Sequence, residues 1–125
     1  MSRTVINTEK APGAIGPYSQ GIRTGNLVYT SGQLPINAAT GEMATEIKEA
    51  TKYSLENCKA ILEEAGTSMD KVVKTTVFLK DLKDFNAMNE VYATFFTSEP
   101  PARSCFQVAA LPKDALVEIE VVAEI

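Results

Sequence analysis

Two stretches near the C-terminal end alternate between apolar and other residues, and they constrain the fold more than any other feature. Within 117–125 every second residue is apolar, and Glu118 and Glu120 lie between these apolar positions. Successive side chains of a strand point to opposite faces, so this stretch predicts a strand with one fully apolar face. A weaker alternation runs through 103–110, and the turn signal Leu-Pro-Lys-Asp separates the two stretches. The pattern predicts a hairpin of two strands.

The alternation also assigns side chains to faces. In the first stretch Arg103, Cys105 and Gln107 share one face, and the other face carries Ser104, Phe106, Val108 and Ala110. If the apolar faces of both strands share a core, we expect Arg103, Cys105 and Gln107 to share the opposite face with Glu118 and Glu120. A guanidinium beside carboxylates would suit binding a small acid and activating water over it.

The middle of the chain is helical in pattern. Between residues 45 and 65 apolar and small residues recur at three- and four-residue spacing, which predicts a helix with one buried stripe. The stripe consists of Ile47, Ala50, Thr51, Ser54, Leu55, Cys58, Ile61, Leu62 and Ala65. Thr45 is the expected N-cap, and Gly66 lies where a left-handed C-terminal residue is favoured. Cys58 lies in the stripe, so we expect it to pack in the core.

The remaining elements follow from similar patterns. They are an edge strand over 3–7, a Gly/Pro loop over 10–17, a hairpin over 20–31 with a Gly-Asn turn, a β-branched central strand over 71–79, and a second helix from Asp81 or Asp84 to about Phe96. This order predicts one α+β domain over residues 1–125. We expect two layers, with a mixed β-sheet of about six strands and two helices on one face.

The strand over 71–79 is apolar on both faces. Val73, Val77 and Leu79 are expected to alternate with Val72 and Phe78. Two helices cover only one face of the sheet, and the sequence contains no third layer. We therefore expect another copy of the protein to cover the other face.

Composition excludes several kinds of chemistry. The chain has a formal charge of −4, no histidine and two cysteines, Cys58 and Cys105. The negative charge argues against binding to a phosphate backbone, and the lack of histidine argues against a zinc site and against Ser-His or Cys-His catalysis. We expect no cofactor and no metal. The first residues lack the apolar segment of a signal peptide, and no stretch reaches membrane-spanning length, so we expect a cytoplasmic protein.

Several segments, in this order, resemble one known family. They are Ile15-Gly-Pro-Tyr-Ser-Gln-Gly21, Thr30-Ser-Gly-Gln33, Lys74-Thr-Thr-Val-Phe78, Pro101-Ala-Arg-Ser104, Leu111-Pro-Lys113 and Val117-Glu-Ile-Glu120. The chain resembles the RidA (YjgF) family of reactive-intermediate deaminases along nearly its whole length. The resemblance implies a chorismate-mutase-like fold and a homotrimer with clefts between subunits. It also implies the activity of the arginine-containing branch, which hydrolyses 2-imino acids, released by pyridoxal-phosphate enzymes acting on Thr or Ser, to 2-oxo acids and ammonia.

The resemblance also assigns roles to residues. Arg103 is similar to the family's carboxylate-binding arginine, and Glu118 to its water-orienting acid. The rest of the pocket is expected to comprise Tyr18, Ser31, Gly32, Asn89 and Cys105. Spacing alone favours a solvated or salt-bridged Arg103, and only the family motif reverses that preference. Spacing also does not choose between Glu118 and Glu120. Asn89 could instead bond to backbone, and Cys105 lacks a base to activate it, so we interpret it as pocket wall.

Three functions are compatible with these observations. The first is deamination of small 2-imino acids, and the second is non-catalytic binding of 2-oxo or other small carboxylic acids in the same cleft. The third is action on nucleic acid, as a translation inhibitor or ribonuclease. The acidic charge and the absence of histidine weigh against the third.

Overall fold

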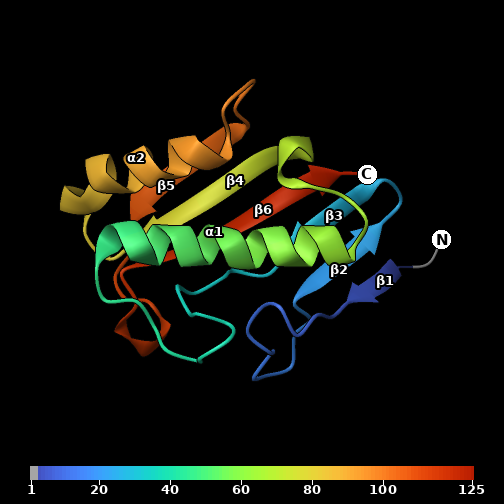
Figure 1. Ribbon diagram of the computed structural model, residues 1–125, viewed down its shortest axis with the longest axis horizontal. Helices are drawn as coiled ribbons and strands as arrows, with labels where there is room; N and C mark the ends of the chain where they lie inside the picture. The colour runs from blue at the N-terminus through green and yellow to red at the C-terminus, as the bar shows by residue number, and fades with distance from the viewer. Residues whose placement is uncertain (1–2) are drawn as a thin grey trace.

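In the part of the chain that the structure describes, six strands form one mixed sheet in the order β1-β2-β3-β6-β4-β5, and two helices lie on one face of it (Figure 1). The computed structural model describes residues 3–125. The elements are β1 Arg3–Ile6, β2 Gly21–Thr24, β3 Leu27–Thr30, α1 Ile47–Glu64, β4 Val72–Leu79, α2 Phe85–Phe95, β5 Ala102–Gln107 and β6 Val117–Glu124. Short 3-10 turns occupy Met69–Lys71, Leu82–Asp84 and Pro112–Asp114. The two-layer α+β prediction is confirmed.

Helix α1 follows its predicted stripe. Ala50, Leu55, Cys58 and Leu62 are fully buried against the sheet, as the spacing predicts. The N-cap prediction is wrong by one residue, because the carboxylate of Glu46, not Thr45, accepts hydrogen bonds from the N–H groups of Lys48 and Glu49. The C-terminal prediction is confirmed, since Gly66 has a φ of 92°.

Helix α2 begins after a short turn. Asp81 accepts a hydrogen bond from the N–H of Lys83 and so caps the 3-10 turn, whereas Asp84 precedes α2 without a side-chain cap bond. Met88 and Tyr92 are the buried residues of this helix, and Phe96 is buried just beyond it. Asp81 therefore precedes the 3-10 turn and Asp84 precedes α2, so both lie in the region where the helix start was predicted.

The predicted pairing of the last two strands is wrong. Strand β5 pairs in parallel with β4, and β6 pairs antiparallel with both β4 and β3, so β4 separates β5 from β6. Burial explains this order. Strand β6 has an unbroken apolar face and takes a central position, whereas β5 contains arginine, serine and glutamine and forms an edge of the sheet.

The prediction that Arg103 and Glu118 share a face is also wrong. Directly paired residues of neighbouring strands project to the same face. Arg103 and Val121 both pair with Thr75, which is fully buried beneath the helices. Glu118 pairs with Phe78, and so does Phe106. Arg103 and Cys105 therefore face the helices, while Glu118 and Glu120 lie on the opposite face, called here the open face.

A β-bulge in β4 changes which valine is buried. The register with β6 shifts between Val72 and Lys74, so Val73 is the extra residue. Val72 joins the core, whereas Val73 is exposed. The expected grouping of Val73 with Val77 and Leu79 is therefore wrong at this one position.

The open face keeps apolar residues in contact with solvent. Tyr29 and Phe106 are each 44% exposed. Phe78 contacts Phe106 edge-on on the same face, with ring centroids 5.4 Å apart. The prediction that the helices leave one face uncovered is confirmed. What covers that face remains a prediction.

Candidate functional site

Helix α2 positions Arg103 at the edge of the sheet. The guanidinium carbon of Arg103 lies 4.7 Å from the ring centroid of Tyr92 and 5.5 Å from that of Phe85. Its Nη1 donates a hydrogen bond of 2.6 Å to Oδ1 of Asn89. Asn89 and Tyr92 are three residues apart on α2, so one helix face presents both contacts. The guanidinium is thereby held by an amide at one nitrogen and by aromatic faces.

Arg103 is not part of a salt bridge within the described chain. The ion pairs of residues 3–125 are Lys48–Glu90 and Lys80–Asp114, and neither involves Arg103. Asn89 is neutral, so the positive charge is not compensated by a carboxylate. The Arg103 guanidinium is therefore suited to bind an anion through two parallel hydrogen bonds.

Cys105 lies two residues from Arg103 on the same face and packs against the core. Burial raises the pKa of its thiol, and the charge of Arg103 opposes that shift only in part. The thiol form is therefore favoured over the nucleophilic thiolate. The role of Cys105 as pocket wall stays a prediction.

Glu118 lies on the open face and packs tightly against Gly32. A Cβ added to Gly32 would lie 2.7 Å from both Cδ and Oε2 of Glu118, so only glycine leaves room for the carboxylate there. Burial raises the pKa of Glu118, and the negative charge of nearby Glu120 raises it further. The surroundings of Glu118 thus disfavour its charged form.

The carboxylate of Glu118 opens onto a cavity of about 610 Å³. The cavity is lined by Ile15, Tyr18, Ser31, Gly32, Leu34, Pro112, Lys113, Glu118 and Glu120. Ser31 ties two of the lining segments together, because its hydroxyl donates to the carbonyl of Ser19 and its N–H to the carbonyl of Gln20. Tyr18 is half exposed at this cavity.

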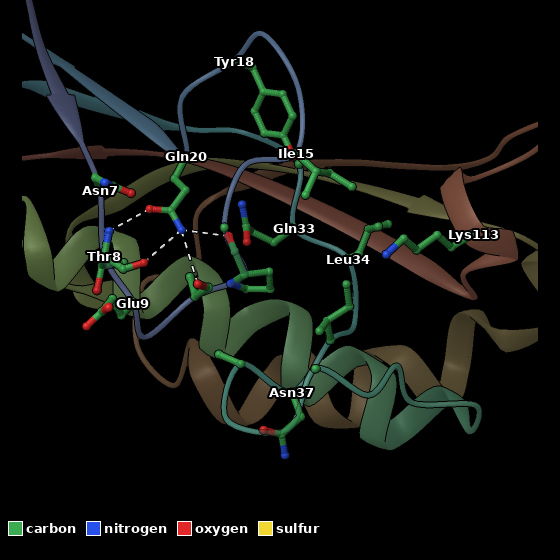
Figure 2. Close-up of a pocket in the computed structure, with 17 residues that line it drawn as sticks. Asn7, Thr8, Glu9, Ile15, Tyr18, Gln20, Gln33, Leu34, Asn37 and Lys113 are labelled. Carbon is green, nitrogen blue, oxygen red and sulfur yellow. Dashed lines mark hydrogen bonds between the residues drawn. The ribbon is translucent and has the colours of Figure 1, made fainter.

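A second cavity of about 530 Å³ adjoins the first and shares Ile15, Tyr18, Gly32, Leu34 and Lys113 with it. Figure 2 shows Gln20 bonded to the loop that follows β1. Its side chain is 2% exposed, accepts from the N–H of Thr8 and donates to the carbonyls of Thr8, Ala11 and Pro12. Gln20 therefore fixes the loop that carries Tyr18.

The predicted site residues fall into two groups within one chain. Asn89, Arg103 and Cys105 lie together on the helix side of β5, and we call them the arginine half. Tyr18, Ser31, Gly32 and Glu118 lie together on the other side, and we call them the glutamate half. The fold places the two halves on opposite faces of the sheet, so one chain does not bring them together.

Three residues of this region were not predicted as site residues. Tyr92 was expected only as part of the second helix, although its ring lies against Arg103. Phe85 was assigned in the same way. Lys113 lines both cavities and has a left-handed backbone, with a φ of 56°. Its place in the Leu-Pro-Lys segment was the available sequence signal.

The comparisons with known proteins identify the family. The family model described as endoribonuclease L-PSP matches residues 8–125. A Pyrococcus abyssi protein named as a RutC family member is 56% identical over 124 residues, covering 98% of each chain. An Escherichia coli protein named 2-iminobutanoate/2-iminopropanoate deaminase is 52% identical over 126 residues, again covering 98% of each chain. The chain belongs to the RidA (YjgF) family.

Solved structures agree with this assignment. The chain superposes on the crystal structure of Escherichia coli TdcF with bound serine at a TM-score of 0.94, with 48% identity and 98% coverage of each chain. That structure shows a small amino acid bound to a RidA-family protein.

Among residues 3–125, no three His, Cys, Asp or Glu side chains gather closely enough to hold a metal ion. Over the same residues, neither helix combines the length and the apolar character that crossing a membrane requires.

Proposed function

We propose that this chain hydrolyses small 2-imino acids, such as 2-iminobutanoate and 2-iminopropanoate, to 2-oxo acids and ammonia. Such imines are released by pyridoxal-phosphate enzymes that act on Thr or Ser. The observation that carries the proposal is the Arg103 guanidinium, which Asn89 and Tyr92 hold in place without a carboxylate partner. The names of the curated relatives and the serine bound to TdcF support the same substrate class.

The active site is completed between subunits. The arginine half of one subunit meets the glutamate half of its neighbour in a homotrimer. The separation of the halves on opposite faces supports this arrangement, since no movement within one sheet could join them. The exposed apolar residues of the open face, such as Tyr29 and Phe106, give a second subunit a surface to cover.

Each half has its own role in hydrolysis. Arg103 binds the substrate carboxylate through two parallel hydrogen bonds and so fixes the plane of the imine. Glu118 accepts a proton from a water molecule, whose oxygen attacks the imine carbon and forms a tetrahedral carbinolamine. Glu118 passes this proton to the imine nitrogen, which completes the neutral carbinolamine. The hydroxyl proton of the carbinolamine then moves to the same nitrogen through Glu118, the C–N bond breaks, and ammonia leaves as the C=O bond forms. The net reaction consumes one water for each imine, and no covalent enzyme intermediate is required.

Turnover tests the proposal. Threonine dehydratase supplies 2-iminobutanoate from threonine, and the rate of 2-oxobutanoate formation is followed with and without this protein. We expect the protein to accelerate the loss of the imine. Binding of 2-oxobutanoate without acceleration would instead establish the non-catalytic carboxylate binder. Cleavage of RNA under the same conditions, without imine hydrolysis, would establish the ribonuclease alternative.

A mixing experiment tests whether the site lies between subunits. Subunits carrying Arg103→Ala and subunits carrying Glu118→Gln are unfolded together, refolded together and assayed. Each variant alone is expected to be nearly inactive. If each site combines two chains, a site is intact only when one chain supplies Arg103 and its neighbour supplies Glu118. Random assembly of equal amounts then restores about one quarter of the sites. A mixture no more active than its components would show that both residues must come from the same chain.

Assembly is measured independently by sedimentation equilibrium. We expect a mass three times that of the 13.5 kDa chain. A monomer at micromolar concentration would refute both the trimer and the inter-subunit site.

A further inference from the structure

We propose that Tyr92 and Thr75 form a positioning pair that sets the orientation of Arg103 toward the substrate carboxylate. The hydroxyl groups of Tyr92 and Thr75 lie 2.8 Å apart in a buried hydrogen bond. This inference rests on the proposed function and adds to it two residues that do not touch the substrate. They act through Arg103.

The pair belongs to a closed set of contacts around Arg103. Thr75 is the direct strand partner of Arg103 in the parallel pair of β4 and β5. Tyr92 comes from α2, and its ring lies 4.7 Å from the Arg103 guanidinium carbon. The hydrogen bond between Tyr92 and Thr75 therefore joins the helix to the strand beside Arg103. The ring under the guanidinium is fixed from its hydroxyl end.

The ring is supported on a second side as well. Tyr92 contacts Phe96 with ring centroids 4.7 Å apart. Asn89 comes from the same helix, one turn before Tyr92, and bonds to Nη1 of Arg103. A shift of α2 relative to β4 would therefore move both the amide and the ring that hold the guanidinium. The hydroxyl pair is the polar link that opposes such a shift.

Core packing alone does not account for this hydroxyl pair. Thr75 is fully buried, and Tyr92 is 7% exposed. Replacing both members of a buried hydrogen bond by apolar groups of the same shape is nearly neutral for stability. Valine at position 75 and phenylalanine at position 92 would fill nearly the same space. The hydrogen bond between Tyr92 and Thr75 therefore fixes the orientation of the Tyr92 ring and the position of α2 relative to β4. Its contribution to the stability of the fold is smaller.

A double variant separates positioning from stability. Thr75→Val combined with Tyr92→Phe removes both hydroxyls and leaves neither partner unsatisfied. We expect its thermal unfolding midpoint to stay close to that of the wild type. We expect kcat/KM for 2-iminobutanoate to fall about five- to tenfold, equivalent to about 1 to 1.4 kcal/mol. The affinity for 2-oxobutanoate, which carries the same carboxylate, should fall by a similar factor.

The Arg103→Lys background tests whether the pair acts through Arg103. Lysine lacks the planar guanidinium, so its contact with the carboxylate depends little on the orientation of the side chain. Adding the double variant to Arg103→Lys should therefore cause no further loss of kcat/KM. The matched control is Tyr53→Phe, since the Tyr53 hydroxyl accepts a hydrogen bond from Asn37 away from Arg103. It should leave both kinetics and ligand affinity unchanged.

Two outcomes would overturn the inference. One is a double variant with wild-type kcat/KM and wild-type affinity for 2-oxobutanoate. The other is an equal loss in the wild-type and Arg103→Lys backgrounds, because a purely structural effect would not depend on the arginine. If the wild type itself hydrolysed no imine, the proposed function would fail. The affinity of the variants for 2-oxobutanoate would then still decide the positioning role.

Discussion

Replacing Gly32 by alanine should disable Glu118 while leaving the fold intact. The added Cβ would lie 2.7 Å from Cδ and Oε2 of Glu118, whereas ordinary contact begins at 3.4 Å. The carboxylate must therefore retreat by about 0.7 Å or turn away. A misplacement of about 1 Å in a catalytic group can cost about a hundredfold in rate. We expect kcat for imine hydrolysis to fall about ten- to hundredfold, or about 1.4 to 2.7 kcal/mol in activation free energy.

Stability should change little, because the atoms in the way are the end of a flexible side chain. We expect the free energy of unfolding to remain within about 1 kcal/mol of the wild type. The assay combines steady-state imine hydrolysis, supplied by threonine dehydratase, with urea-induced unfolding. Gly13→Ala is the matched control, since a Cβ there would have nothing within 4 Å. It should match the wild type in both measurements.

A second background makes the test specific. In Glu118→Ala the carboxylate is absent, so the methyl group at position 32 has nothing to displace. Gly32→Ala should then cause no additional loss of rate. Wild-type turnover in Gly32→Ala would refute the reasoning, and so would an equal loss in both backgrounds. Either result would mean that the close approach of Gly32 and Glu118 does not set the position of the base.

The other predictions concern the charged groups. Arg103→Lys should be nearly as damaging as Arg103→Ala, with a loss of about 10- to 100-fold in kcat/KM. The reason is that the point charge of lysine does not fix the plane of the substrate carboxylate. Near wild-type kinetics in Arg103→Lys would show that positive charge suffices. Glu118→Gln should slow hydrolysis while 2-oxobutanoate still binds, and Glu120→Gln should keep the wild-type rate at neutral pH; parallel binding and rate measurements distinguish these results. Activity should fall on acidification at a pH above the usual glutamate range, because burial and Glu120 raise the pKa of Glu118, and Glu120→Gln should move this acid limb to lower pH. A raised carboxyl pKa favours the folded state below the unfolded-state pKa, and this advantage is lost as the pH rises through the folded-state pKa. Glu118→Gln should therefore raise the urea midpoint relative to wild type at neutral pH, and this difference should disappear on acidification.

Local sequence pattern determined most of the secondary structure. The stripe of α1 was readable because its apolar spacing, its length and Gly66 all indicate one helix. The alternation of β6 showed which of its residues are buried, and the Gly-Asn turn placed β2 beside β3. In each case the information lies within one element or one turn, where propensity and periodicity act.

The resemblance to a family supplied the candidate site, which local pattern did not. Spacing left Glu118 and Glu120 equivalent, and it allowed Arg103 to be an ordinary salt-bridged residue. In the structure, Glu118 is the carboxylate that packs against Gly32, and Arg103 is bonded to the neutral amide of Asn89. Both distinctions depend on contacts between residues far apart in the chain.

Strand order was decided only by the tertiary structure. Two adjacent alternating stretches predict a hairpin, but burial of the apolar face of β6 places that strand between β3 and β4, and β4 separates it from β5. Register along β4 then aligns Arg103 with Thr75 and Glu118 with Phe78, which turns the arginine toward the helices and the glutamate toward the open face. Alternation within a strand shows which of its residues share a face. Only pairing with neighbouring strands shows whether that face is the helix-covered face or the open face. For this reason the residues of both halves could be predicted from the sequence, but their placement on opposite faces of the sheet could not.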